Sequence, residues 1–145
     1  MTGPATILHV EDEAPNRALL RAVFARCPDG SISGATLREA GDLAEARRIV
    51  AAEVVDVVLL DVRLPDGNGL QLARELSVGS SPRPDVVVMS ASVLPAERDA
   101  ALAAGAGHFL PKPYVPAELT RLIGALLERR RTRIGPVPAG SASRP

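Results

Sequence analysis

The sequence predicts one α/β domain in which a parallel sheet carries helices on both faces. Short apolar runs typical of buried strands alternate along the chain with longer segments whose apolar residues recur at helical spacing. Strands that alternate with helices pair in parallel, because parallel strands are joined by long, right-handed crossovers. The length of 145 residues suits a single domain with a sizeable core.

The predicted strands are short, and the third is the clearest. The run Val54–Leu60 is almost continuously apolar, which is typical of a strand buried on both faces of its sheet. The second strand has the weakest pattern. The five predicted strands cover 5–10, 31–38, 55–60, 85–90 and 107–110.

Local signals mark the ends of several predicted helices. Pro15 suits an early helical position, Asp42 is expected to cap the second helix, and the Pro/Asp/Gly cluster at 28–30 ends the first. A further turn cluster follows Asp61 and precedes the third helix. The five predicted helices run from about 15 to 26, 43 to 50, 69 to 77, 95 to 104 and 116 to 130.

Composition and charge exclude several classes of protein. No apolar run approaches the ~20 residues that span a bilayer, and no signal-peptide pattern opens the chain, so we expect a cytoplasmic protein. The single Cys27 excludes an intrachain disulfide, and cysteine and histidine are too few for a zinc site. His9 and His108 are expected to be structural.

The charge is unevenly distributed although the net charge is zero. Residues 1–128 hold 12 bases and 17 acids, a net charge of −5, which argues against a nucleic-acid-binding domain. The other five bases, all arginines, lie at 129, 130, 131, 133 and 144. We expect the cluster at 129–133 to be a solvated helix end whose cations complement the helix dipole. Contact with an acidic partner or RNA is the alternative.

Polar residues lie at or directly after the ends of four of the five predicted strands. Glu11 and Asp12 follow the first strand, Asp61 the third, and Lys112 the fifth, while Ser90 ends the fourth. The carboxyl ends of parallel strands meet at one edge of the sheet, and ligands bind at that edge in open α/β folds. These side chains are therefore expected to form one site.

Three clustered carboxylates require a cation, and an all-oxygen cluster suits Mg²⁺. With the metal bound, Asp61 can stay ionised and act as a nucleophile toward a phosphoryl group. The metal, the Lys112 ammonium and the Ser90 hydroxyl can then each take one equatorial phosphoryl oxygen. The residues predict an acyl phosphate on Asp61.

At this point the chain resembles the receiver domain of two-component response regulators, over roughly residues 5–128. The resemblance is carried, in order along the chain, by Val10-Glu11-Asp12, Leu60-Asp61-Val62-Arg63-Leu64-Pro65-Asp66-Gly67-Asn68-Gly69, Met89-Ser90-Ala91 and His108-Phe109-Leu110-Pro111-Lys112-Pro113. It implies a flavodoxin-like fold with strand order 2-1-3-4-5.

The resemblance also implies roles at the phosphorylation site. Asp61 would be the phosphoacceptor and Asp12 a direct ligand of Mg²⁺. Glu11 would bind the metal in the second shell or through water, and the backbone carbonyl of Arg63 would complete the protein ligands. By analogy, the long cationic side chain at Arg63 tunes hydrolysis of the phosphoryl group in a direction that the sequence leaves open.

Further roles concern the switch that follows phosphorylation. Ser90 matches the switch hydroxyl and Phe109 the switch aromatic, while Lys112 matches the lysine of the family motif. The resemblance allows a cis peptide bond before Pro113. Phe109 stands where many members have tyrosine, so an output that needs a tyrosine hydrogen bond is unavailable. A switch that works by burying the ring remains open.

We expect a stand-alone response regulator with a receiver domain at 1–130 and a basic, disordered tail at 131–145. It would catalyse only its own phosphorylation and dephosphorylation, with a histidine kinase or phosphotransfer protein as donor. Output would run through protein contacts of the fourth helix, fifth strand and fifth helix, with no DNA-binding domain and no membrane. Monomer and homodimer both stay open.

Three alternatives remain. The first alternative is a constitutive protein-interaction module with a vestigial site. The second is a receiver piece of a hybrid kinase. A phosphatase with an aspartate nucleophile ranks last, because such enzymes carry a second aspartate two residues later, where this chain has Arg63.

Overall fold

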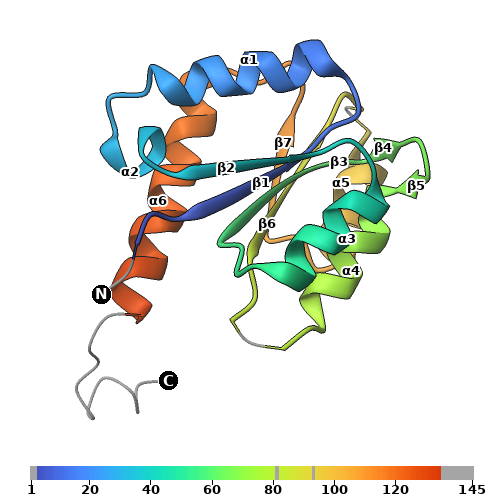
Figure 1. Cartoon of the computed structure of the whole chain (residues 1–145). Helices are drawn as coiled ribbons and strands as arrows, with labels where there is room; N and C mark the ends of the chain where they lie inside the picture. The colour runs from blue at the N-terminus through green and yellow to red at the C-terminus, as the bar shows by residue number, and fades with distance from the viewer. Residues whose placement is uncertain (1–2, 81, 93, 135–145) are drawn as a thin grey trace.

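A computed structural model describes residues 3–80, 82–92 and 94–134 and shows a five-stranded parallel sheet (Figure 1). The strand order is β2-β1-β3-β6-β7, which is 2-1-3-4-5 when only the strands of this sheet are counted. The order implied by the resemblance is therefore confirmed. The strands are β1 (Thr6–Val10), β2 (Thr36–Ala40), β3 (Val57–Asp61), β6 (Asp85–Ser90) and β7 (His108–Pro111).

Helices cover both faces of the sheet (Figure 1). One face packs against α1 (Ala14–Ala25), the one-turn α2 (Gly30–Ser33) and α6 (Pro116–Ile134). The other face packs against α3 (Leu43–Ala52), α4 (Gly69–Ser77) and α5 (Pro95–Ala103).

Each face of the sheet has its own hydrophobic core, because successive strand residues point to opposite faces. Along β3, Val58 and Leu60 belong to the core under α3, α4 and α5, whereas Val57 and Leu59 belong to the core under α1 and α6. All four are fully buried. This two-sided burial explains the unbroken apolar run that marks β3 in the sequence.

The prediction of a strand at 31–38 was wrong in its first half. Residues 30–33 form α2, because the Asp29 side chain accepts a hydrogen bond from the Ser31 N–H and caps the helix, and because Ile32 buries its side chain. The strand β2 begins later and runs to Ala40. It is an edge strand, so its solvent-facing side chains are polar and gave no apolar signal.

Two further features were absent from the predicted elements. The loop after Asp61 contains a two-stranded antiparallel hairpin of β4 (Arg63–Leu64) and β5 (Gly67–Asn68). The last helix, predicted to end near 130, continues to Ile134. Residues 131–134 are therefore helical, and the rest of the predicted tail, 135–145, lies outside the described residues.

Arg130 contradicts the expectation of a solvated helix end. Only 6% of its side chain is exposed, and its guanidinium lies 3.4 Å from Asp56 Oδ1 and 3.3 Å from Asp85 Oδ2. It also donates to the backbone carbonyl of Arg83 at 3.0 Å. Side chains at 129 and 131 remain exposed. The sequence could not separate Arg130 from these neighbours, since the acids that pair with it are distant in the chain.

Among the helices of the described residues, none has the length and apolar character needed to cross a membrane.

Candidate functional site

The site lies where the strands of the sheet end. Asp61 is the last residue of β3 and pairs in register with Met89 of β6. Glu11 follows β1, and its backbone N–H donates to the carbonyl of Ala40 at 2.8 Å. Parallel pairing thus brings the carboxyl ends of β1, β3 and β6 to one edge, as the sequence predicts.

Three carboxylates meet at this edge. Glu11, Asp12 and Asp61 each offer a carboxylate oxygen, and these oxygens lie within 4.8 Å of one another. Glu11 is buried, Asp61 is partly buried and Asp12 is exposed. The three acids singled out in the sequence are therefore brought together, with a gradient of exposure from the interior to solvent.

Lys112 is the cation of the site. Its Nζ donates to Glu11 Oε1 at 2.9 Å and approaches Asp61 Oδ2 at 3.5 Å. The backbone N–H of Lys112 donates to the carbonyl of Ser90 at 2.8 Å, and the peptide bond to Pro113 is cis. The loop after β7 is thereby anchored to the end of β6, and the ammonium group is directed between the two acids.

The two acids respond to this environment in opposite directions. Burial raises the pKa of the Asp61 carboxyl above its ordinary value, and the charge of Glu11 adds to the effect while Lys112 opposes it. Burial also works to raise the pKa of Glu11. There the hydrogen bonds from Lys112 and the Glu13 N–H prevail, and the pKa lies below its ordinary value.

The Lys112 ammonium stays charged for the same reason. Burial alone would lower the pKa of Lys112, but its contacts with the two carboxylates outweigh burial and hold the pKa above its ordinary value. The site therefore presents a fixed positive charge beside a carboxylate whose own charge is only weakly satisfied.

The loop after Asp61 is held by hydrogen bonds at both ends. The Arg63 N–H reaches Asp61 Oδ1 at 3.4 Å, and the Asn68 side chain caps α4 through the Leu70 N–H at 2.8 Å. At the tip, the Asp66 carboxylate accepts from the N–H groups of Leu43 and Ala44 at the start of α3. Sequence reasoning treated this loop as turn chemistry and did not find the cap supplied by Asp66.

The two predicted switch residues lie on β6 and β7. Ser90 is buried at the end of β6, and its hydroxyl accepts from the Ser92 N–H at 3.1 Å. Phe109 is half-buried and packs against the core under α3, α4 and α5. The structure thus places Ser90 at the edge with the acids and Phe109 within the adjoining core. Their roles as switch residues, and the role of the Arg63 carbonyl, stay predictions.

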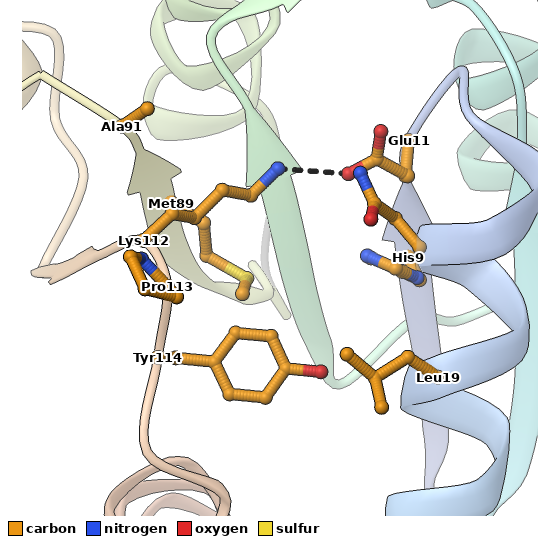
Figure 2. A pocket seen from close by; sticks show the side chains of 9 residues that line it. His9, Glu11, Leu19, Met89, Ala91, Lys112, Pro113 and Tyr114 are labelled. Carbon is orange, nitrogen blue, oxygen red and sulfur yellow. Dashed lines mark hydrogen bonds and ion pairs between the residues drawn. The ribbon is translucent and has the colours of Figure 1, made fainter.

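A cavity that the sequence did not reveal borders this site (Figure 2). His9 and Tyr114 contribute to its wall, together with Glu11 and Lys112. His9 is only 4% exposed, and burial lowers the pKa of its imidazole to about 4. A histidine in a strand and an aromatic after Pro113 give no sequence signal of a shared cavity, because both are ordinary core positions.

The donor set fits Mg²⁺. The clustered atoms are all carboxylate oxygens, the ligand type that hard divalent cations prefer, and the exposed Asp12 leaves one side open to water. Asp12 and Asp61 would hold the ion, with Glu11 behind them already bonded to Lys112 and to the Glu13 N–H. When bound, the metal neutralises the carboxylates and a phosphoryl oxygen.

Comparison with known families gives one clear match. The family model of the response regulator receiver domain matches residues 7–124. The matched span contains the strands of the sheet, apart from Thr6 at the start of β1, and every side chain placed at the site above.

Curated relatives include a protein that is named a response regulator. The chain is 35% identical over 133 residues to the response regulator MprA of Mycobacterium sp. strain KMS, covering 92% of this chain and 55% of that protein. It is 32% identical over 126 residues to the protein PetR of Rhodobacter capsulatus, covering 87% and 50%. The chain spans about half the length of the curated relatives that it matches.

Solved structures agree on the fold. A putative response regulator from Chloroflexus aurantiacus has a TM-score of 0.76 and 25% identity over 86% of this chain and 98% of that one. The N-terminal domain of a Wolinella succinogenes protein has a TM-score of 0.75 and 26% identity over 89% and 98%. With strand order, acidic edge, lysine and family match in agreement, the chain belongs to the family of response regulator receiver domains.

Proposed function

We propose that the chain is a phosphorylation switch that accepts a phosphoryl group on Asp61 with Mg²⁺ as cofactor. The observation that carries the proposal is the contact of Lys112 with both Glu11 and Asp61 inside the acidic cluster. A partly buried lysine between two carboxylates supplies positive charge where an incoming phosphoryl group gathers negative charge. The donor would be a histidine kinase or a phosphotransfer protein.

Three residues of the site take part in the proposed phosphoryl transfer. A carboxylate oxygen of Asp61 forms a bond to phosphorus while the bond from phosphorus to the donor's imidazole nitrogen breaks, and the electron pair of that bond stays on the nitrogen. The Lys112 ammonium donates to one phosphoryl oxygen and the Ser90 hydroxyl to another. The Ser90 hydroxyl accepts a hydrogen bond from the Ser92 N–H, and its own proton is free to donate to the phosphoryl oxygen.

We further propose that output runs through the face of α5, β7 and α6. Ser90 and Ser92 are joined by a hydrogen bond just before α5 begins, and the Lys112 N–H ties β7 to β6. Movement of Ser90 toward a phosphoryl group therefore pulls on the segment that leads into α5. A two-state element biased by phosphate is the usual form of such a switch.

The remaining parts of the proposal follow the expectations from the sequence. The chain catalyses only its own phosphorylation and dephosphorylation, acts in the cytoplasm and works as a stand-alone regulator. The stand-alone form is checked by the mass of the protein in its source cells. A band near the 15.1 kDa of this sequence supports it, and a larger product contradicts it.

The test of the proposal is intact-mass analysis after incubation with acetyl phosphate and Mg²⁺. We expect the wild-type chain to gain one phosphoryl group of about 80 Da. The Asp61→Asn variant, and the wild-type chain in EDTA, should gain none. Purified histidine kinase labelled with radioactive phosphate provides a second donor if acetyl phosphate reacts slowly.

The constitutive interaction module makes the opposite prediction. A vestigial site would accept phosphate from neither donor and would bind a protein partner equally with and without them. Transfer to the wild-type chain but not to Asp61→Asn excludes that alternative, whereas the absence of labelling from both donors overturns the proposal.

A further inference from the structure

A cavity of about 290 Å³ opens beside the phosphorylation site, between the β1–α1 side of the domain and the loop that joins β7 to α6 (Figure 2). Most of its wall is apolar: Leu19 comes from α1, Met89 from β6, and Pro113 and the ring of Tyr114 from the loop. Asp61 does not line it. The cavity is therefore a neighbour of the phosphoacceptor and not part of its pocket.

Two polar atoms in the wall are buried without a partner. Within the described part of the chain, neither His9 Nδ1 nor the Tyr114 hydroxyl has a hydrogen-bond partner. Figure 2 shows the two side chains on facing walls, with the Tyr114 hydroxyl directed across the space. An unpaired buried polar group costs about 1–3 kcal/mol, and such groups normally have a partner in the protein or an ordered water, so these two atoms still require one.

The size of the cavity indicates the size of the molecule. A dry cavity of about 150 Å³ in another protein holds benzene, and this one is about twice as large. Its volume therefore suits two fused rings or an aliphatic molecule of similar bulk. Most of the wall is carbon, and Glu11, Asn16 and Lys112 are its polar side chains besides His9 and Tyr114.

The charges nearby indicate the polarity of the molecule. Glu11 borders the cavity and disfavours an anion, while its charge is already answered by Lys112, which removes the attraction for a cation. A hydroxyl or amide both donates and accepts hydrogen bonds, so one such group can serve an imidazole nitrogen and a phenol together.

We propose that this cavity is a binding site for a small, uncharged, mainly apolar organic molecule that carries one hydroxyl or amide group. The site goes beyond the proposed phosphorylation and does not depend on it. Because Glu11 and Lys112 line both the cavity and the acidic edge, an occupant would lie in contact with groups that surround the phosphoacceptor.

The test is a ¹H–¹⁵N chemical-shift titration of the whole chain with 2-naphthol, without metal or phosphodonor. We expect saturable shifts of backbone amides in 9–19 and 112–115, with half-saturation below 1 mM, at about −0.4 kcal/mol for each non-hydrogen atom. Naphthalene, which lacks the hydroxyl, should bind at least five-fold more weakly, the factor that one net hydrogen bond is worth.

Variants separate this cavity from other surfaces. Tyr114→Phe should weaken 2-naphthol about five-fold, and Leu19→Trp, which fills the cavity from α1, should abolish saturation. Leu102→Trp is the matched control, since Leu102 is similarly exposed but lies on α5 at the other face of the sheet. Asp61→Asn should bind normally, so loss of phosphorylation and loss of binding are measured independently.

The proposal is overturned if 2-naphthol gives no saturable shifts up to its solubility limit. It is also overturned if naphthalene binds equally well, or if Leu19→Trp and Tyr114→Phe bind like the wild-type chain.

Discussion

Glu11 and Asp61 contact the same lysine, yet their carboxyl groups differ in how well their charge is satisfied. Glu11 receives Lys112 at 2.9 Å and the Glu13 N–H at 3.2 Å, whereas the contacts of Asp61 are 3.5 Å and 3.4 Å long. A carboxylate with weakly satisfied charge is the better nucleophile. At the residue scale, hydrogen bonding thus makes Glu11 a fixed anion and leaves Asp61 reactive.

The charged carboxylate of Asp61 is expected to lower the stability of the fold. Because its folded pKa is raised, stability falls as pH rises from the ordinary carboxyl pKa through the folded one, and the penalty persists at pH 7. In EDTA at pH 7, Asp61→Asn should therefore raise the free energy of unfolding, because it removes a charge that burial disfavours. Urea denaturation measures it.

Glu11→Gln is the matched control for this prediction. Its pKa is lowered on folding, so its charge stabilises the fold above the ordinary carboxyl pKa, and the substitution should destabilise the protein. Equal effects of the two substitutions would contradict the electrostatic difference between the two acids.

His9 gives a second prediction at the residue scale, because it is buried with a pKa of about 4. Between pH 6.5 and 4 the unfolded chain binds a proton that the folded chain does not, so stability falls as pH falls through this window. From pH 6.5 to 5 the loss should be about 1–2 kcal/mol, from two-state linkage. Urea denaturation at each pH measures it.

His9→Gln should flatten the dependence of stability on pH above pH 5. An unchanged slope in His9→Gln would show that another group binds the proton.

At the scale of elements, the hairpin of β4 and β5 sets the position of Asp61. The hairpin leaves β3 at Asp61 and returns to α4 at Gly69, whose N–H donates to the Val62 carbonyl at 2.7 Å. Asp66 attaches the tip of the hairpin to α3. The backbone that carries Asp61 is therefore held between two helices and not left as a free loop.

Gly69 allows this close return of the chain. A Cβ at Gly69 would lie 2.1 Å from the Asp61 carbonyl oxygen, a backbone atom that cannot move without moving the Asp61 side chain. Gly69→Ala should therefore lower the free energy of unfolding by about 3 kcal/mol, the upper range for overpacking. It should also slow labelling by acetyl phosphate by one to two orders of magnitude, roughly the cost of a misplaced reacting group.

Gly107→Ala is the control, because a Cβ there meets nothing within 4 Å. Its stability and labelling rate should match those of the wild-type chain. If Gly69→Ala were equally harmless, the close approach to Asp61 would not hold in solution.

At the scale of the whole molecule, the two edges of the sheet have different tasks. The carboxyl edge carries the acids and Lys112. The amino edge is closed by Arg130, which joins α6 to Asp56, just before β3, and to Asp85, the first residue of β6. Asp56 also accepts from the Thr6 N–H at 2.8 Å, so β1 belongs to the same network. The network of Arg130, which stabilises the fold, therefore lies one strand length away from the acids and Lys112 of the candidate site.

This separation predicts the behaviour of Arg130→Ala. Removing a buried guanidinium leaves Asp56 and Asp85 without their main cation and should cost about 3 kcal/mol of unfolding free energy. Labelling of the folded variant should stay within two-fold of the wild-type rate, because the site lies at the other edge. Urea denaturation and intact mass measure the two effects.

Arg131→Ala is the exposed counterpart. Arg131 pairs with Glu128 on the surface of α6, and its removal should change stability by less than about 0.5 kcal/mol. A similar loss from both substitutions would contradict the closing role of Arg130.

The sequence by itself determined the fold class, the edge of the site and most of its residues. Strand periodicity and alternation with helices require a parallel sheet, and parallel strands bring Glu11, Asp61 and Lys112 to one edge wherever their exact boundaries fall. These features depend on local pattern and on chain direction, which a single sequence contains.

The tertiary structure decided what depends on contacts between distant segments. The burial of Arg130 is set by acids 74 and 45 residues away, and the cavity by the facing of His9 and Tyr114. The cap that Asp66 provides for α3 crosses 23 residues. No local pattern marks such residues, because the same side chains serve equally well as surface or core until the fold assigns their partners.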